Sequence, residues 1–367
     1  MKRFLVKLGL LVLGLLIPLM LLEIGLRLWG FPASDIYRRD LQSGLLLLNP
    51  NKNIYVASEC FRNTVATNSL GFHSKEYSLE KPAHTYRIAI IGDSFIEAQQ
   101  VSLEDMISAR LETKLNALPN RTVAYEVLPF GISSHGTRQN ILYTQQFAMQ
   151  FHPDLVIDAF VMNDPQDDAN DITPSFNSDG TLKIEPVPVP PTSPIVKSVK
   201  KVFRKSVLVT TVRKKYQTLK SKSAPSSTGV PAEVEILMTD YSDFWKEAWR
   251  REDQLLTSFK KVAQQDGAQF MVVSLTNGYR VHPELISEFE KLTKGVAVDF
   301  DKPEKILNLI AGADNFPYLA LTPIFRERAR HDTALTVWSC DGHWNAQGHE
   351  WGAQALADYL VQNHILP

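Results

Sequence analysis

The sequence predicts a doubly wound, flavodoxin-like α/β/α sandwich with a mostly parallel sheet, preceded by one N-terminal transmembrane helix. Predicted strands and amphipathic helices alternate from residue 87 onward, which is typical of this class. One of these strands, residues 153–164, is apolar on both faces, as expected in a parallel sheet that is covered on both sides. The chain has 367 residues and 44% hydrophobic residues, enough for a large core.

The N-terminal segment is long and apolar enough to cross a membrane. Residues 4–26 give a run of 23 when the two charged side chains within it reach toward the interface, and a span needs about 20. Three basic residues near its start favour a cytoplasmic N-terminus: Lys2, Arg3 and Lys7. No small-residue cleavage site follows, so we expect residues 1–30 to be an uncleaved signal anchor. A cleaved signal peptide is the alternative. With a cytoplasmic N-terminus and an uncleaved anchor, the globular part would be periplasmic or extracellular.

The first half of the predicted domain contains three strands and two helices. Residues 87–92, with the apolar run Ile88 to Ile91, predict a strand, and residues 103–118 show the spacing of an amphipathic helix. Residues 124–131 predict the second strand, residues 137–151 the second helix, and residues 153–164 the third strand.

The second half continues the alternation. Residues 243–267 predict a long amphipathic helix, and residues 268–275 a fourth strand. Residues 316–325 are a weaker candidate for a fifth strand, and residues 345–363 predict a terminal helix.

Two segments do not follow this pattern. Residues 31–85 are polar and rich in turn formers, and they predict a stalk and entry segment before the domain at 86–367. The domain is interrupted at 172–235 by a Pro-rich run and a basic stretch, with ten Lys and Arg between Lys197 and Lys222. That stretch could form an amphipathic helix on an anionic membrane surface, or a solvated helix or loop.

Composition excludes several function classes. Lys and Arg number 39 and Asp and Glu 40, for a net charge of -1, so no dedicated nucleic-acid binder is expected. The two cysteines, Cys60 and Cys340, have no metal-site spacing, and the acidic loop after the third strand has no known ligand spacing. We therefore expect neither a metal nor a cofactor.

Chemically useful residues follow several predicted strands. In an open α/β sheet, ligands bind where the strands end. The residues that would meet there are Ser94, Gly131, Asn163, Asp341 and His343. A Ser hydroxyl becomes nucleophilic when a base such as His takes its proton, and an Asp can orient that His. The backbone N–H groups of Ser94 and Gly131 and the amide of Asn163 could stabilise an oxyanion. Taken alone, Ser94 is better explained as a helix cap than as a nucleophile.

These blocks, in this order, resemble the SGNH (GDSL-type) hydrolase superfamily. The resemblance runs from about residue 67 to the C-terminus, without the 172–235 insertion, and includes membrane-anchored members. It implies that Ser94 is the nucleophile, that Asp341 and His343 complete the triad, and that Gly131 and Asn163 belong to the oxyanion hole.

The last block departs from the usual Asp-x-x-His-Pro-Asn and reads Asp-x-His-Trp-Asn, which resembles the alginate and peptidoglycan O-acetyltransferase branch. In addition, Val161 replaces a usual Gly and Phe95 a usual Leu. Trp344 and His135 could line the pocket, or could instead anchor a loop.

The sequence therefore predicts an ester hydrolase that acts outside the cytoplasm on an acyl or acetyl ester. An O-acyltransferase that modifies a cell-surface polysaccharide would use the same residues. A non-catalytic envelope assembly protein on this scaffold is a second alternative. Cys60 and Cys340 could form a disulfide that ties the entry segment to the catalytic loop, or could be two buried thiols.

Overall fold

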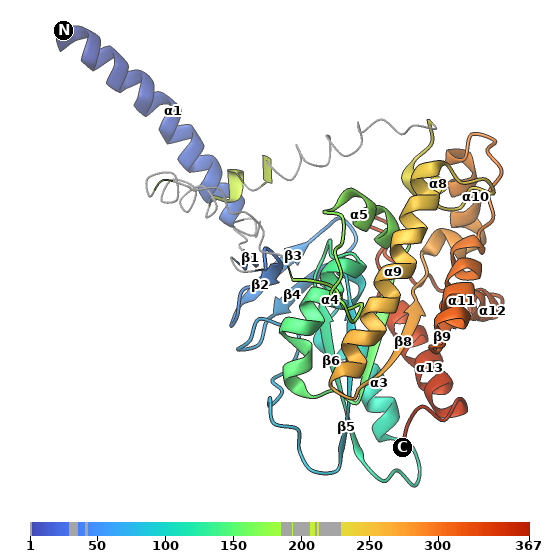
Figure 1. Cartoon of the computed structure of the whole chain (residues 1–367). Helices are drawn as coiled ribbons and strands as arrows, with labels where there is room; N and C mark the ends of the chain where they lie inside the picture. Colours follow the sequence, from blue (N-terminus) through green and yellow to red (C-terminus); the bar gives the residue numbers. More distant parts are fainter. Residues whose placement is uncertain are drawn as a thin grey trace.

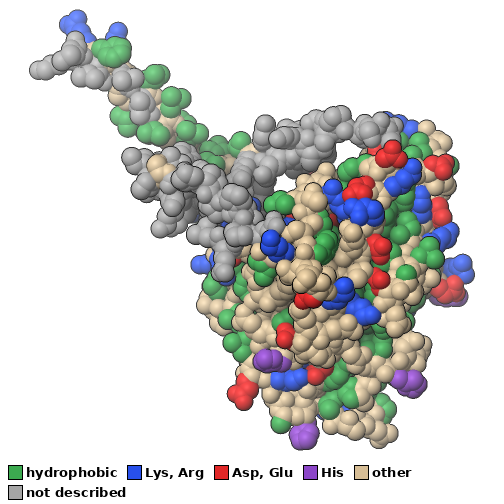
Figure 2. Space-filling model, in the orientation of Figure 1, with side chains coloured by type: hydrophobic (Ala, Val, Ile, Leu, Met, Phe, Trp, Pro, Cys, Tyr) green, Lys and Arg blue, Asp and Glu red, His purple; other side chains and the backbone are tan. Residues whose placement is uncertain are grey.

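The computed structural model describes residues 2–28, 36–40, 43–184, 193, 206–209, 211–212 and 229–367. Residues 29–35 and most of the basic part of the insertion therefore lie outside the described residues, and with them the prediction of a membrane-surface helix. The N-terminal helix α1, Lys2–Leu28, contains Pro18 and projects from the rest of the molecule (Figure 1). Its stretch Gly9–Leu28 has a mean hydropathy of 2.4 and no buried part, and its visible surface is mainly hydrophobic (Figure 2). By length and composition this helix could cross a membrane.

A five-stranded parallel sheet forms the centre of the domain, as predicted. Its order is β6-β5-β7-β8-β9, which is the 2-1-3-4-5 order of flavodoxin-like folds. The strands are β5 (Thr85–Gly92), β6 (Ala124–Gly131), β7 (Leu155–Phe160), β8 (Gln269–Ser274) and β9 (Tyr318–Ala320). Strand order reverses between β5 and β7, and ligands bind at such a switch point.

Helices cover both faces of the sheet (Figure 1). Side chains alternate between the faces of a strand, so Ile88 and Ile90 enter one core and Ala89 and Ile91 the other. The first core is closed by α3 (Ile107–Asn116), α12 (Leu321–Ala329) and α13 (Ala346–Gln362). The second is closed by α4 (Thr137–Gln146), α9 (Asp243–Gln265) and α11 (Lys302–Asp314).

Several boundaries differ from the sequence predictions. The stretch 316–325 contains only the short strand β9 before α12 begins. The two early helices are shorter than predicted, because η1 (Leu103–Asp105) precedes α3 and η2 (Ala148–Phe151) follows α4. A short helix, α2 (Ser94–Glu97), follows β5, as the interpretation of Ser94 as a helix cap expected, although Asp93 and not Ser94 is its cap. Among the described residues, the helices α5 (Asp164–Asn170), α8 (Ala232–Glu235) and α10 (Pro283–Leu292) were not predicted.

The segment predicted as a stalk is, where described, folded onto the domain. It forms two antiparallel hairpins, from β1 (Tyr37–Arg39) with β2 (Leu46–Leu48) and from β3 (Asn53–Ala57) with β4 (Arg62–Ala66). Leu47, Leu48, Val65 and Phe72 are buried in the second core. Burial of this apolar surface holds the segment against the domain.

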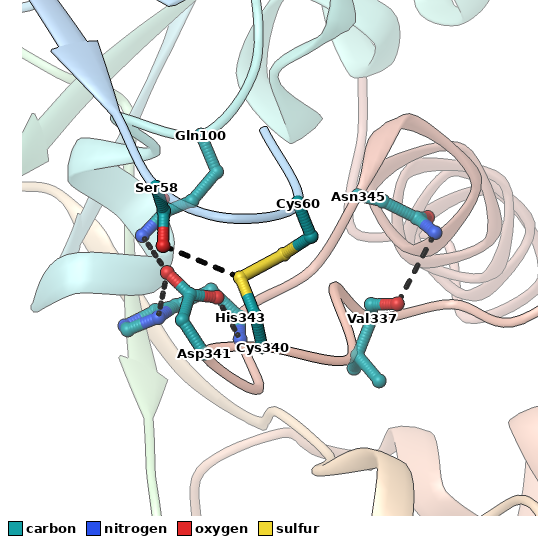
Figure 3. The surroundings of a disulfide bond; sticks show 8 residues. All are labelled: Ser58, Cys60, Gln100, Val337, Cys340, Asp341, His343 and Asn345. Carbon is teal, nitrogen blue, oxygen red and sulfur yellow. Dashed lines mark hydrogen bonds and ion pairs between the residues drawn. A yellow bond between two sulfur atoms is a disulfide. The ribbon is translucent and has the colours of Figure 1, made fainter. Parts of the chain in front are cut away.

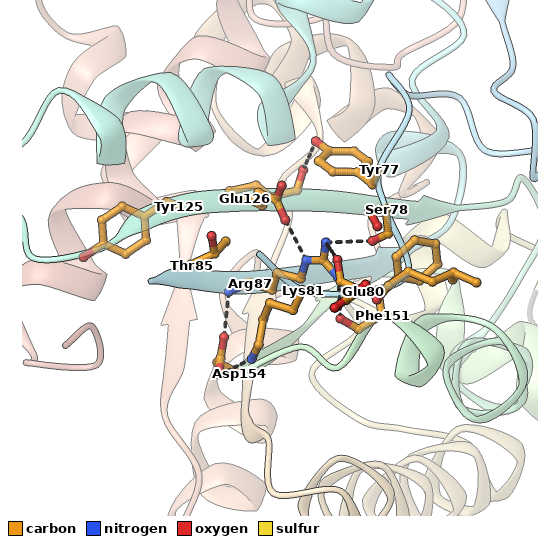
Figure 4. A network of polar contacts seen from close by, with 12 residues as sticks. Tyr77, Ser78, Glu80, Lys81, Thr85, Arg87, Tyr125, Glu126, Phe151 and Asp154 are labelled. Carbon is orange, nitrogen blue, oxygen red and sulfur yellow. Dashed lines mark hydrogen bonds and ion pairs between the residues drawn. The ribbon is translucent and has the colours of Figure 1, made fainter. Parts of the chain in front are cut away.

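A buried arginine fixes the end of the sheet opposite the strand carboxyl termini (Figure 4). Arg87 on β5 has no exposed surface, and its Nε donates to Glu126 on β6 at 2.6 Å. Its remaining guanidinium hydrogens donate to backbone carbonyls of the preceding loop and of η2: Ser78, Leu79, Glu80 and Phe151. A buried charge is tolerated only when its donors are satisfied in this way, so Arg87 holds the entry loop to the sheet.

Candidate active site

Ser94 lies at the turn between β5 and α2. The short helix begins at Ser94 and is capped by Asp93, whose Oδ1 accepts from Phe95 N at 2.9 Å. A side chain at Gly92 would meet Ile96 Cγ1 at 2.6 Å, so the turn is tight. Because Asp93 already supplies the cap, Ser94 is not needed for that purpose, and its hydroxyl is half-buried beside His343.

In the structure, Ser94 contacts His343, and His343 in turn contacts Asp341. His343 Nε2 lies 2.8 Å from Ser94 Oγ, and His343 Nδ1 lies 3.4 Å from Asp341 Oδ2. Asp341 Oδ1 also accepts from His343 N at 3.0 Å. At 3.4 Å, His343 Nδ1 and Asp341 Oδ2 form an ion-pair contact and not a hydrogen bond, and catalytic contacts of this kind commonly tighten only when substrate is present.

The local backbone explains how Asp341 and His343 can contact each other although they are only two residues apart in the sequence. Val337 and Trp344 pair as an antiparallel bridge, so residues 337–344 form a narrow hairpin with Asp341 and His343 at its tip. Gly342 between them has a φ of 80°, a left-handed conformation that favours glycine. The hairpin turns both side chains toward the end of β5.

The surroundings suit His343 to exchange a proton. Burial opposes its protonation, but the nearby Asp341 carboxylate outweighs that effect and raises the pKa of His343 above its ordinary value. The same contact lowers the pKa of Asp341, although burial alone would raise it. Asp341 therefore stays ionised and stabilises the imidazolium.

A disulfide joins the entry segment to this hairpin (Figure 3). Cys60 and Cys340 are bonded, with Cα atoms 5.9 Å apart, and Cys340 directly precedes Asp341. Gln100, which follows α2, donates from Nε2 to Asp341 Oδ2 at 3.2 Å. The tip of the hairpin is thus held from two sides.

The two other predicted oxyanion residues occupy different settings. Asn163 is exposed after β7, and its Nδ2 donates to Asp167 at 2.8 Å, which leaves its second amide hydrogen available. Gly131 is the last residue of β6, and a Cβ there would lie 2.1 Å from Glu97 N. Close packing against α2 therefore explains the glycine at 131, and its role as an oxyanion donor stays a prediction.

A cleft of about 720 Å³ opens beside His343. His343, Asn163 and Phe95 line it, together with residues of α8 (Ala232–Glu235) and α10 (Pro283–Leu292). Trp344 and His135 do not line this cleft. Trp344 is buried, stacks on Phe325 and donates from Nε1 to Thr276 O, so it anchors the hairpin; His135 is buried beside Tyr143, and burial lowers its pKa to about 4.

One buried residue near Ser94 was missed by the sequence analysis. Glu97, at the end of α2, has 1% of its surface exposed and accepts from Tyr37 Oη at 2.8 Å and from Ser133 N. His73 Nδ1 contacts Glu97 O at 2.6 Å. Glu97 thus connects the nucleophile turn to the segment that follows α1. A lone Glu in a predicted helix usually faces solvent, so the sequence gave no signal.

Fully buried acids extend inward from the nucleophile turn. Burial, with the nearby Asp168 carboxylate, raises the pKa of Asp158 to about 8, and burial raises those of Asp168 to about 7 and Asp93 to about 6. Burial also raises the pKa values of Asp164 and Glu252. Among the described residues, no group of three or more His, Cys, Asp or Glu could hold a metal ion. Burial of these carboxyl groups favours their protonated, neutral forms.

This cluster predicts a loss of stability toward alkaline pH. The folded protein keeps protons that the unfolded chain begins to release near pH 4, so the contribution of these acids to the free energy of unfolding should fall from about pH 4 to about pH 8. Asp158→Asn keeps this position neutral at every pH. We expect it to reduce the slope of the free energy of unfolding against pH by up to about 1.4 kcal/mol per pH unit. Urea unfolding of the detergent-solubilised chain measures it, with Asp358→Asn on the surface of α13 as the control. Equal slopes for all three proteins would contradict the prediction.

Comparisons with known proteins were made for the whole chain. No protein-family model matches it, and no curated protein matches it. Among solved structures, it is similar to an alpha/beta hydrolase from the metagenome of Lake Arreo, with a TM-score of 0.42 and 12% identity over 75% of this chain and 95% of the other. It is also similar to an acetylxylan esterase from Geobacillus stearothermophilus, with a TM-score of 0.43 and 12% identity over 75% of this chain and 94% of the other. A lipase/acylhydrolase from Enterococcus faecalis has a TM-score of 0.39 and 10% identity over 76% of this chain and 96% of the other. These TM-scores lie below 0.5, so the function proposed below rests on the geometry of the chain itself.

Proposed function

We propose that the chain is a serine-dependent ester hydrolase of the SGNH type. The observation that carries the proposal is the 2.8 Å contact between Ser94 Oγ and His343 Nε2, with Asp341 on the opposite ring nitrogen. This is the arrangement of a nucleophile, a base and an orienting acid. The raised pKa of His343 keeps its proton affinity close to that needed near neutral pH.

The reaction would proceed in two halves. His343 Nε2 takes the Ser94 proton while Oγ bonds to the ester carbonyl carbon, and the resulting oxyanion accepts from Ser94 N, Gly131 N and the Asn163 amide. The bond to the alcohol oxygen then breaks, and His343 protonates that oxygen. Water, deprotonated by His343, attacks the acyl-enzyme, and the acid leaves as Ser94 regains its proton.

The second candidate is an O-acyltransferase, in which a sugar hydroxyl replaces the water. The short Asp-x-His-Trp block favours it by resemblance, and the cleft of about 720 Å³ beside His343 has room for a saccharide acceptor. For the hydrolase, a cell-surface polysaccharide is the proposed carrier of the ester. For the transferase, it is the proposed acceptor of the acyl group.

The proposed location is outside the cytoplasm, on a single membrane anchor. α1 has the length and hydropathy of a span, and the Cys60–Cys340 disulfide suits an oxidising compartment. The described part of 31–85 then lies between membrane and active site and contacts both Glu97 and Cys340.

A partition experiment tests this function. The detergent-solubilised chain is incubated with a chromogenic acetyl ester, with and without a soluble oligosaccharide. We expect ester turnover in both cases, and acetylated sugar by mass spectrometry only if the transferase candidate is correct. Absence of ester turnover under both conditions would refute the proposed function and favour the non-catalytic assembly protein.

A further inference from the structure

The charges that line the cleft beside His343 are all negative at neutral pH, apart from any proton on His343 itself. Its described lining contains the carboxylates of Glu233, Glu288 and Asp341, and no Lys or Arg. Asp341 is occupied by His343 and Gln100. Glu233 and Glu288 are exposed, and among the described residues no cation forms an ion pair with either.

Aromatic side chains line the same cleft as these two carboxylates. Glu288 shares one face of α10 with Leu285, Phe289 and Leu292, all of which line the cleft. Tyr279 stacks on Phe289 with ring centroids 4.1 Å apart, and Trp338 from the catalytic hairpin lines the same cleft. Aromatic faces attract cations within about 6 Å of the ring, and adjacent carboxylates strengthen that preference.

The position of His343 indicates which part of an ester enters this cleft. In the proposed reaction, His343 Nε2 protonates the departing alcohol oxygen, and His343 itself lines the cleft. The alcohol part of the substrate therefore leaves the reacting carbon on this side. A negative group in that part would share the cleft with the carboxylates of Glu233 and Glu288, which is unfavourable.

We propose that the cleft selects esters whose alcohol part carries a positive charge, such as an ammonium group. Glu233 and Glu288 are the residues that determine this specificity, and anionic alcohols such as uronates or phosphate-bearing polyols are rejected. The inference rests on the proposed function and gives it a substrate class. An amine-bearing sugar would combine this charge with the polysaccharide proposed above.

Two acetyl esters of nearly equal shape test the proposal: acetylcholine and its uncharged isostere 3,3-dimethylbutyl acetate. We expect the wild-type chain to show a higher kcat/KM for the charged ester. The variant Glu233→Gln with Glu288→Gln should lower the ratio of the two kcat/KM values about tenfold, which corresponds to roughly 1.4 kcal/mol. Added salt should lower the wild-type ratio as well, because it screens the carboxylates.

A matched control removes the same number of charges from exposed positions of α10 outside the lining of the cleft. Glu284→Gln with Glu290→Gln alters two exposed residues of α10 that do not line the cleft, and it should keep the wild-type ratio. A ratio that is equal in the wild-type chain and in the Glu233/Glu288 variant would overturn the proposal. So would faster turnover of an anionic acetyl ester.

Choline binding, measured by calorimetry, separates this proposal from the proposed function because it needs no turnover. Choline should bind to the wild-type chain and about tenfold more weakly to the Glu233/Glu288 variant. If ester turnover is absent but choline still binds in this carboxylate-dependent way, the hydrolase assignment fails and the cation site stands. If both esters turn over without any charge preference, and choline binding does not depend on the two carboxylates, the cation site fails and the hydrolase assignment stands.

Discussion

Ser94→Ala should lower ester turnover by about 10⁶-fold, with the fold unchanged. Removal of the nucleophile of a serine triad costs about that factor, since the triad acts as a unit. The cost to stability should be small, because Asp93 rather than Ser94 caps α2 and the hydroxyl is only half-buried. Turnover of a chromogenic acetyl ester measures the first effect, and thermal unfolding of the solubilised chain measures the second.

The control for this variant is Ser287→Ala, which removes an exposed hydroxyl from α10 and should keep wild-type turnover. A Ser94→Ala chain that retains more than about a tenth of the wild-type kcat would exclude Ser94 as the nucleophile. The non-catalytic assembly protein would then be the better description of the chain.

Asp341→Asn should lower kcat by about 10⁴-fold and shift the acidic limb of the pH profile. The substitution keeps the shape of the hairpin tip but allows His343 to adopt the wrong tautomer, which costs about that much in serine triads. The Asp341 carboxylate outweighs burial to raise the pKa of His343, so its loss lowers that pKa. Because neutral His343 is the base, activity in the wild type is lost as pH falls through the raised value, and in the variant it should persist to lower pH.

The pH profile distinguishes this role from a structural one. A variant that was merely misfolded would lose activity at every pH without moving the limb. Asp332→Asn, in the exposed turn after α12, serves as the control and should leave both kcat and the limb unchanged. An Asp341→Asn limb at the wild-type position would show that Asp341 does not act through His343.

The sheet and the ends of its strands were predictable because their signals are local and strong. The apolar run 88–91 is typical of a buried strand, and β6 has the predicted bounds Ala124–Gly131. The ordering of polar residues after these strands then placed Ser94, Asn163 and His343 at one edge. The order of the strands follows general rules for α/β chains, and it brings the ends of these strands to the same edge of the sheet.

The parts that were not predicted depend on contacts between distant residues. The hairpins β1–β2 and β3–β4 are short and carry little periodicity, so their burial against the core is visible only in three dimensions. Glu97 is an ordinary helical residue until Tyr37 and Ser133 are brought to it. Trp344 has both a polar N–H group and a large apolar ring, so the sequence alone suits a pocket position as well as a core position. In the structure it packs against Phe95 and Phe325 in the core.

Trapping the acyl-enzyme tests the central claim most directly. The solubilised chain is mixed with an excess of a chromogenic acetyl ester, quenched in acid during the first turnover and digested for mass spectrometry. We predict the mass of one acetyl group on the peptide that contains Ser94, and none in the Ser94→Ala chain. Turnover of the ester with no acetyl group on Ser94, or with the label on another residue, would contradict the proposed mechanism.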